Sequence, residues 1–318
     1  MLMKPTDFNA LVLDDIHPMF LEELEALGIN VLQKLGIERN ELETIISQFD
    51  IIVVNSKTTI DKYLIDAATN LKFICRPGSG MENVDVAYAE SKNIGCLNSP
   101  EGNCVAVAEH ALAMIMMWYR NIRKAADEVR KGIWLRKENA GEELHTKTIG
   151  IVGYGHTGSA LAIRAAALGM KVLAYDKYKM GFGNEQIEEC SFDKIKSDAD
   201  IISFHLPLTI ETKYLANAIF FEQLKKEILL VNTSRGGVVE TSALIKALQE
   251  NKIKGACLDV LENENLKSWN SEEKKQYQFL FKQEHVLITP HIAGWTNESK
   301  YAMAAVLIQK LKKNLKIN

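Results

Sequence analysis

The chain has 318 residues and a formal net charge of −3, and 47% of its residues are hydrophobic. This length predicts two domains, and the composition supplies enough apolar side chains for two sizeable cores. No long basic segment interrupts the chain, which argues against nucleic acid as the main partner. No apolar run predicts a membrane span, and the N-terminal sequence lacks the pattern of a secretory signal, so we expect a cytoplasmic protein.

The cysteines are scattered along the chain without the spacing of metal ligands. They are Cys75, Cys96, Cys104, Cys190 and Cys257. Most lie in apolar runs, which is typical of buried free thiols. We therefore expect no metal site, and a reducing compartment agrees with the cytoplasmic expectation.

The first hundred residues alternate short apolar runs with helical patterns. The expected strands are 11–13, 30–32, 51–54, 71–75 and 94–97, and the expected helices are 18–27, 38–48 and 84–91. Strands and helices that alternate at this spacing predict βαβ units around a parallel sheet. Residues 1–99 therefore predict an α/β domain.

A long helix is expected over residues 104–124, after the polar segment 98–103. Alanine, methionine, leucine and tryptophan occur on nearly all of its sides, which is typical of a buried helix. We expect this helix to pack between domains or against a second subunit.

The clearest motif in the chain lies between residues 148 and 176. An apolar run at 148–152 predicts a buried strand, and Gly153, Gly155 and Gly158 then form a G-x-G-x-x-G pattern. A helical segment and a second apolar run follow, and this run ends at Asp176. A strand, a glycine turn, a helix, a strand and an acid in this order predict a dinucleotide-binding unit.

Each part of this unit has a physical role. Gly153 allows the tight turn, Gly155 lets the backbone approach a pyrophosphate, and Gly158 lets the helix pack closely on the strand. The N-terminus of the helix offers free N–H groups to the phosphates. Asp176 can accept hydrogen bonds from the adenosine ribose and would repel a 2′-phosphate, which predicts NAD rather than NADP.

After residue 176, predicted strands and helices continue to alternate. The expected strands are 200–204, 227–231, 256–260 and 286–289, and the expected helices are 240–249 and 296–315. Residues 177–183 predict a loop, and the charged stretch 261–284 has no clear period and predicts a surface excursion. The last helix carries Met303, Leu307 and Leu311 on one face and is expected to return to the first domain. We therefore predict one domain from 1–99 and 293–318, and another from 100–292.

Four polar residues lie at or shortly after the ends of predicted strands, where chemistry is expected. Ligands of open parallel sheets bind beyond the carboxyl ends of the strands. Arg235, Asp259 and His291 lie there, and Glu264 follows shortly after a strand. Arg can bind a carboxylate through two parallel hydrogen bonds, His can transfer a proton near neutral pH, and a nearby Glu raises an imidazole pKa. Each alone could be a salt-bridge arginine, a loop histidine or a surface acid, but their joint placement favours a catalytic set.

Further motifs follow one another along the chain. They are residues 76–85, 98–103 with 107–110, 205–207 with Thr212, 232–236, 258–264 and 289–294. Together with the glycine motif, they resemble the D-isomer-specific 2-hydroxyacid dehydrogenase family over nearly the whole length. The resemblance implies an α/β fold of two domains, with an NAD-binding Rossmann domain inserted in a flavodoxin-like substrate domain. It also implies an NAD-dependent dehydrogenase that acts on a small-molecule D-2-hydroxy acid.

The resemblance assigns roles to individual residues. Catalytic roles fall to Arg235, Glu264 and His291. Cofactor contacts are expected at Gly153, Gly155, His156, Thr157, Gly158, Asp176, His205, Leu206, Pro207, Thr212, Thr233, Ser234, Asp259 and His291. Substrate contacts are expected at Asn55, Arg76, Ser79, Gly80, Arg235 and His291. Under this hypothesis, Arg235 and the N–H groups of Ser79 and Gly80 hold the substrate carboxylate, and His291 takes the hydroxyl proton.

Residues 132–144 resemble the D-3-phosphoglycerate dehydrogenase branch of the family. This implies D-3-phosphoglycerate and 3-phosphohydroxypyruvate as substrates, within serine biosynthesis. Asn55 stands where that branch often has an arginine, and Asn265 replaces a usual proline. A glycerate dehydrogenase or hydroxypyruvate reductase is an alternative, as is another D-2-hydroxyacid dehydrogenase or a non-enzymatic NAD-sensing protein. We expect a homodimer or homotetramer, and no C-terminal regulatory domain.

Overall fold

The computed structural model describes residues 8–316. The chain divides into two compact units. One unit extends to Asn103 and resumes at Trp295, and the other runs from Cys104 to Gly294. The ends of the predicted first domain, residues 1–7 and 317–318, lie outside the described residues.

The first unit contains a five-stranded sheet in the order β2-β1-β3-β4-β5. Its strands are β1 (Asn9–Val12), β2 (Asn30–Gln33), β3 (Ile51–Val53), β4 (Phe73–Arg76) and β5 (Gly95–Asn98), and all neighbours pair in parallel. This is the strand order of flavodoxin-like folds. The predicted flavodoxin-like α/β architecture is therefore confirmed.

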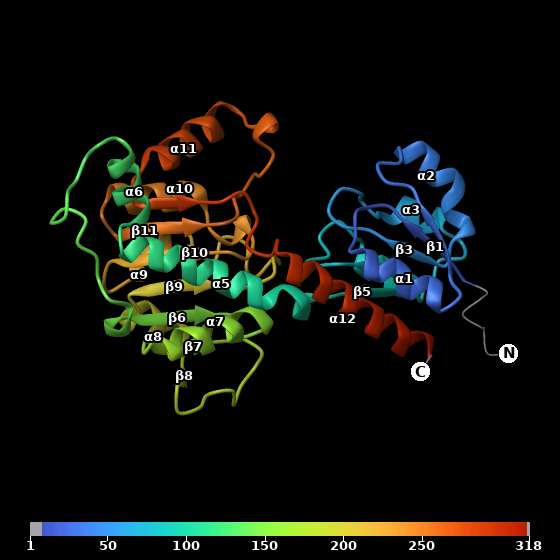
Figure 1. Ribbon diagram of the computed structural model, residues 1–318, viewed down its shortest axis with the longest axis horizontal. Helices are drawn as coiled ribbons and strands as arrows, with labels where there is room; N and C mark the ends of the chain where they lie inside the picture. The colour runs from blue at the N-terminus through green and yellow to red at the C-terminus, as the bar shows by residue number, and fades with distance from the viewer. Residues whose placement is uncertain (1–7, 317–318) are drawn as a thin grey trace. The chain divides into compact units, whose positions relative to one another are not determined.

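Helices cover both faces of this sheet. They are α1 (Pro18–Ala26), α2 (Arg39–Ile45), α3 (Lys62–Ala67), α4 (Val86–Ser91) and α12 (Asn297–Leu315). Figure 1 shows α1 and α12 side by side, and their apolar residues share one core with strand residues such as Val12 and Val53. Leu307 and Leu311 of α12 are fully buried there. The last helix therefore returns to the first unit, as predicted.

The second unit contains a seven-stranded parallel sheet in the order β12-β11-β10-β9-β6-β7-β8. Its strands are β6 (Thr148–Val152), β7 (Lys171–Tyr175), β8 (Ile187–Glu189), β9 (Ile201–Phe204), β10 (Ile228–Asn232), β11 (Ile253–Leu258) and β12 (Val286–Ile288). The chain leaves β6 toward β7 and β8, and then crosses to β9 on the other side of β6. A ligand crevice forms at such a switch point, beyond the carboxyl ends of the strands.

The remaining helices precede the strands of the second sheet or alternate with them. They are α5 (Pro100–Tyr119), α6 (Ile122–Arg130), α7 (His156–Ala167), α8 (Phe192–Asp198), α9 (Ala218–Gln223), α10 (Thr241–Gln249) and α11 (Ser271–Lys282). Two apolar cores fill the two faces of the sheet. The order of strands and helices is that of a Rossmann fold.

The prediction of a single long helix over residues 104–124 is wrong. Helix α5 ends at Tyr119, and α6 begins at Ile122 after Asn121, whose φ is 50°. Asparagine tolerates this left-handed conformation, which breaks the helical hydrogen-bond pattern. Val105, Met116 and Met117 of α5 are exposed in the single chain, so the packing of this helix against a second subunit stays a prediction.

The surface excursion predicted over 261–284 is also wrong in part. It contains helix α11, which begins with a capping box between Asn270 and Glu273. Only Tyr277 and Leu280 of α11 are buried, so the sequence carries little helical periodicity. Four further elements, α3, β8, α8 and α9, are absent from the prediction because they have only three to seven residues, too few to show a clear period.

No helix of residues 8–316 is both long and apolar enough to cross a membrane. Within the same residues, no group of three His, Cys, Asp or Glu side chains is placed to hold a metal ion. Cys75 and Cys257 are buried, whereas Cys96, Cys104 and Cys190 are half-buried. Burial raises the pKa of Cys96 to about 11, which keeps this thiol protonated and unreactive at neutral pH.

Candidate active site

Three glycines shape the turn between β6 and α7, and each meets a different constraint. Gly153 has a φ of 95°, and a Cβ there would lie 2.3 Å from the carbonyl oxygen of His205. A Cβ on Gly158 would lie 1.9 Å from the carbonyl oxygen of Gly153. A Cβ on Gly155 would meet no atom within 4 Å, so open space lies above this residue at the start of α7. The turn therefore leaves room for a ligand at the N-terminus of the helix, where His156 and Thr157 form the first turn.

Asp176 closes this turn from the end of β7. Its Oδ2 accepts a hydrogen bond of 2.8 Å from the backbone N–H of Tyr154. Its Oδ1 accepts hydrogen bonds from the backbone N–H groups of Tyr178 and Lys179, at 2.9 and 3.0 Å. The carboxylate thus fixes both the glycine turn and the start of the next loop, and it remains half-buried at the carboxyl edge of the sheet.

The segment after β9 faces the same turn, because β9 and β7 both pair with β6. His205 Nε2 lies 2.9 Å from the Ser203 hydroxyl, and burial lowers the pKa of His205 to about 4. The ring is therefore neutral at pH 7. Thr212 donates a 2.6 Å hydrogen bond to the carbonyl of Pro207, which fixes the loop that carries Leu206.

Arg235 follows β10 in a turn that Asn232 organises. The Asn232 side chain accepts hydrogen bonds from the N–H and hydroxyl of Ser234, at 3.1 and 2.8 Å. Its amide donates a 2.9 Å hydrogen bond to the Arg235 carbonyl. Glycine is required next, since a Cβ on Gly236 would lie 1.8 Å from the carbonyl oxygen of Leu261. The turn holds Arg235 half-buried, with its guanidinium donating to the Ser234 carbonyl at 2.7 Å.

Asp259 is the buried anchor of the segment after β12. Its side chain is 1% exposed. Oδ1 accepts hydrogen bonds from the Thr289 hydroxyl and the Ile292 N–H at 2.5 and 2.9 Å, and Oδ2 accepts one from the Ala293 N–H at 2.8 Å. Its backbone carbonyl accepts from the N–H of His291 at 2.7 Å. One acid therefore fixes the loop on both sides of His291.

His291 and Glu264 form a close pair, although they lie 27 residues apart. His291 Nδ1 is 2.8 Å from Glu264 Oε2, and about half of each side chain is exposed. The hydrogen bond to Glu264 raises the pKa of His291; burial and the charge of Arg235 oppose this effect. Because Nδ1 is bound to the carboxylate, Nε2 is the nitrogen available to a ligand.

The predicted substrate residues of the first unit lie at the carboxyl ends of β3 and β4. Asn55 donates its backbone N–H to Asp14 Oδ2 at 2.6 Å. Arg76 ends β4, and its guanidinium lies across Gly78, where a Cβ would be 2.3 Å from Nη1. The Ser79 hydroxyl donates to Asn103 Oδ1 at 2.9 Å, and Gly80 is buried next to it. These residues share one edge of the first sheet, whereas Arg235, Glu264 and His291 belong to the second unit.

Three polar residues that the sequence reasoning did not single out support the site. Thr289 links Asp259 to His110, because its hydroxyl lies 3.0 Å from His110 Nε2. Asn232 shapes the Arg235 turn, as described above. Asn232 and Thr289 lie directly at the ends of β10 and β12, and this position offered a signal, since polar residues that end buried strands often serve turns or ligands. His110 lies within α5 and offered no such signal.

Comparison with known proteins identifies the family that the chain is similar to. The D-isomer specific 2-hydroxyacid dehydrogenase family, NAD binding domain, matches residues 112–293. A D-3-phosphoglycerate dehydrogenase of Archaeoglobus fulgidus is 36% identical over 305 residues, which cover 95% of this chain and 56% of the relative. The chain thus spans about half the length of that relative. A hydroxypyruvate reductase of Thermotoga maritima is 35% identical and is matched over 88% of this chain and 90% of its own length.

Among solved structures, a D-lactate dehydrogenase of Aquifex aeolicus complexed with NAD and lactic acid has a TM-score of 0.83. It is 28% identical, and the match covers 97% of this chain and 95% of that chain. The similarity therefore extends over both units and not only over the nucleotide-binding fold.

Proposed function

The chain belongs to the D-isomer specific 2-hydroxyacid dehydrogenase family, and from this premise we propose that it catalyses NAD-dependent interconversion of a D-2-hydroxy acid and its 2-keto acid. The observation that carries the proposal is the 2.8 Å pair of His291 and Glu264 beside Arg235. An NAD-sensing protein without activity would not require a histidine whose pKa is raised by a dedicated carboxylate.

The residues of the second unit fit NAD. The open space at Gly155 and the start of α7 suit a pyrophosphate, and the Asp176 carboxylate suits a ribose hydroxyl. Two buried polar atoms, His205 Nδ1 and Thr233 Oγ1, have no hydrogen-bond partner within residues 8–316. Buried polar atoms are normally satisfied, and a bound dinucleotide would supply partners. When bound, NAD supplies the nicotinamide ring that accepts or returns the hydride.

The protein side of the reaction follows from three residues. Arg235 binds the substrate carboxylate by paired hydrogen bonds. His291 takes the hydroxyl proton at Nε2 during oxidation and returns it to the keto oxygen during reduction. Glu264 orients the imidazole through Nδ1 and stabilises its protonated form. Asp259 and the backbone near Ser234 are proposed to orient the carboxamide of the cofactor.

The pH dependence tests the role of Glu264. Glu264→Gln is expected to lower the pKa of His291, because a neutral amide no longer stabilises the imidazolium. Reduction needs the imidazolium, so its kcat/KM should begin to fall at a lower pH than in the wild type. Oxidation needs the neutral ring, so its rise should also move to lower pH. Profiles of kcat/KM in both directions measure the shift, and unchanged profiles would make Glu264 a surface acid.

The proposed substrate is D-3-phosphoglycerate, with 3-phosphohydroxypyruvate as the keto form, in serine biosynthesis. It is supported by the similarity to D-3-phosphoglycerate dehydrogenases. Glycerate and hydroxypyruvate are the second candidate, because the hydroxypyruvate reductase matches over almost its whole length. A panel of 2-keto acids assayed by NADH absorbance tests both. No oxidation of NADH with any 2-keto acid would reject the proposed activity itself.

Arg76 is the residue that we propose to recognise the substrate phosphate. Its guanidinium lies over Gly78 in the first unit, at the edge where Ser79 and Gly80 follow β4. A guanidinium can bind a phosphate by two hydrogen bonds, each charge-assisted contact contributing about 1.5–3 kcal/mol. Arg76→Ala should therefore raise the KM for 3-phosphohydroxypyruvate about ten- to a hundredfold more than the KM for hydroxypyruvate. An equal rise in KM for both substrates would mean that Arg76 only supports the Gly78 loop.

We further propose that the first unit is the substrate domain, that the second is the NAD-binding domain, and that the enzyme is a homodimer or homotetramer. Self-association is supported by exposed apolar side chains on α6 and the segment after it. They are Ile122, Val129, Ile133, Trp134 and Leu135. Sedimentation velocity of the purified protein measures the oligomeric state. A monomer at micromolar concentration would contradict the proposed homodimer or homotetramer.

A further inference from the structure

Two loops flank the carboxyl end of β6 in the second unit. One follows β7 and carries Lys177 and Tyr178, and the other follows β9 and carries Glu211. Because β7 and β9 both pair with β6, these loops lie on opposite sides of the glycine turn. Any contact between them spans the edge of the sheet where the adenosine half of a dinucleotide binds.

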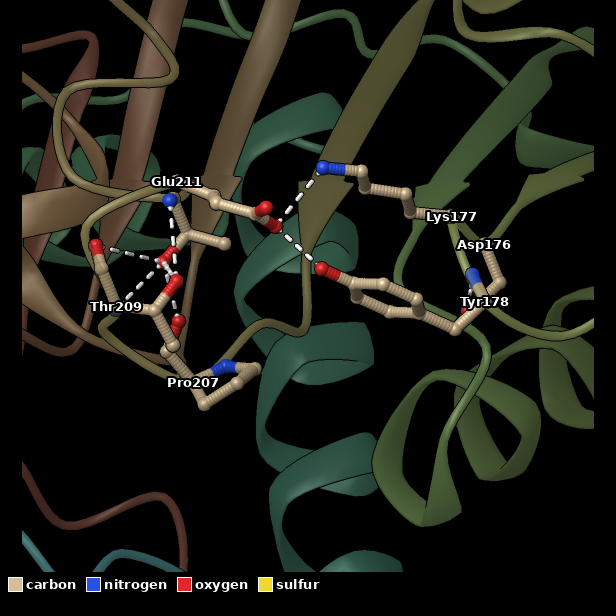
Figure 2. Close-up of polar contacts among 7 residues, drawn as sticks. Asp176, Lys177, Tyr178, Pro207, Thr209 and Glu211 are labelled. Atoms are coloured by element: carbon tan, nitrogen blue, oxygen red, sulfur yellow. Dashed lines mark hydrogen bonds and ion pairs between the residues drawn. The ribbon is translucent and has the colours of Figure 1, made fainter.

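Such a contact is present (Figure 2). Lys177 Nζ lies 2.9 Å from Glu211 Oε2, and the Tyr178 hydroxyl donates a hydrogen bond to the same oxygen. The ammonium group of Lys177 lowers the pKa of Glu211, and the carboxylate raises the pKa of Lys177 in return. Both groups are therefore charged at neutral pH, and the single acid engages both side chains.

Both loops are fixed independently of this contact. Asp176 accepts the backbone N–H groups of Tyr178 and Lys179. On the other side, Thr212 Oγ1 accepts the N–H of Thr209 at 2.8 Å and donates to the Pro207 carbonyl. Glu211 lies within this turn, as Figure 2 shows. The carboxylate is thus presented to Lys177 by a preformed loop.

The charges around Asp176 have opposite effects on the choice between NAD and NADP. An acid at this position favours the ribose hydroxyl of NAD, whereas a nearby cation accommodates the 2′-phosphate of NADP. Lys177 is the next residue along the chain, so the acid alone does not exclude a 2′-phosphate. Glu211 neutralises that cation and also occupies the Tyr178 hydroxyl, which could otherwise donate to a phosphate.

We propose that Glu211 is a second determinant of NAD selectivity, which acts by keeping the Lys177 cation from binding a 2′-phosphate. Asp176 recognises the ribose, and Glu211 removes the neighbouring cation. The pair together excludes NADP in a loop that carries lysines at both 177 and 179.

Glu211→Gln tests the proposal, because it keeps the shape of the side chain and removes its charge. The Kd values of NADH and NADPH are measured by fluorescence titration at one fixed, low ionic strength, since exposed pairs are screened by salt. The ratio of the NADPH Kd to the NADH Kd is expected to fall about five- to tenfold. The shift in unfolding temperature caused by each nucleotide gives a second readout. Neither measurement needs a substrate, so both are independent of the proposed activity.

Two controls make the test specific. The double variant Glu211→Gln/Lys177→Met lacks the released cation, and its ratio should return toward that of wild type. Glu222→Gln makes the same charge change near the end of α9, just before β10 begins and thus toward the opposite edge of the sheet. Its ratio should equal that of wild type. Three results would overturn the proposal. The Kd ratio could stay unchanged in Glu211→Gln, or it could fall equally in Glu222→Gln. It could also remain low in the double variant, which lacks Lys177.

Discussion

Replacement of His291 by alanine is expected to lower turnover about 10²- to 10⁴-fold and to leave the Kd of NADH close to that of wild type. General acid–base groups typically contribute a factor of this size. Nδ1 of His291 is bound to Glu264, so the proton passes through Nε2, and alanine removes both the donor and the acceptor form. Steady-state assays measure turnover, and quenching of NADH fluorescence measures binding.

His285 provides a matched control for this variant. It precedes strand β12, at the end opposite to His291, and burial lowers its pKa. His285→Ala should retain near-normal turnover in protein that remains folded. If His291→Ala kept wild-type turnover, the histidine would have no part in proton transfer. A large rise in the Kd of NADH with unchanged kcat would instead make His291 a cofactor contact.

The parts of the fold that depend on local pattern could be predicted from the sequence. The glycine turn is an example, because Gly153 and Gly158 are required by close backbone approaches that few other residues tolerate. The parallel sheets also follow from apolar runs that alternate with helical segments. Helix α11 was missed because it buries only two side chains, so its sequence resembles a solvated loop.

The sequence names the residues of the proposed site, but it does not show the hydrogen bonds that connect them. The sequence places Asp259 and His291 after separate strands, and parallel strands bring such ends to one edge. It does not reveal that both oxygens of Asp259 are already engaged by the segment from Thr289 to Ala293. Hydrogen bonds between residues about 30 apart depend on tertiary packing, and no local periodicity encodes them. The same holds for the contact of Glu211 with Lys177.

Replacement of Asp259 by alanine is expected to give the largest loss of stability among the site variants. The carboxylate is 1% exposed and accepts hydrogen bonds from the Thr289 hydroxyl and the N–H groups of Ile292 and Ala293. A buried donor left without an acceptor costs about 1–3 kcal/mol. Three such donors predict a loss of several kcal/mol in the free energy of unfolding, measured by urea titration.

The same variant should also lose turnover, because the anchored segment carries His291. His291 has a φ of 55°, a conformation that a non-glycine residue keeps only when its surroundings enforce it. A displacement of about 1 Å at a catalytic group can cost about 10²-fold in rate. Thr289→Val removes only one of the hydrogen bonds to Asp259, so its stability and turnover should fall between those of wild type and Asp259→Ala.

Kd values for NADH separate two roles of Asp259, as an anchor of His291 and as the proposed contact with the cofactor carboxamide. A loss of kcat at unchanged Kd identifies an anchor of His291, whereas a rise in Kd adds the proposed carboxamide contact. Wild-type stability in Asp259→Ala would contradict the anchor.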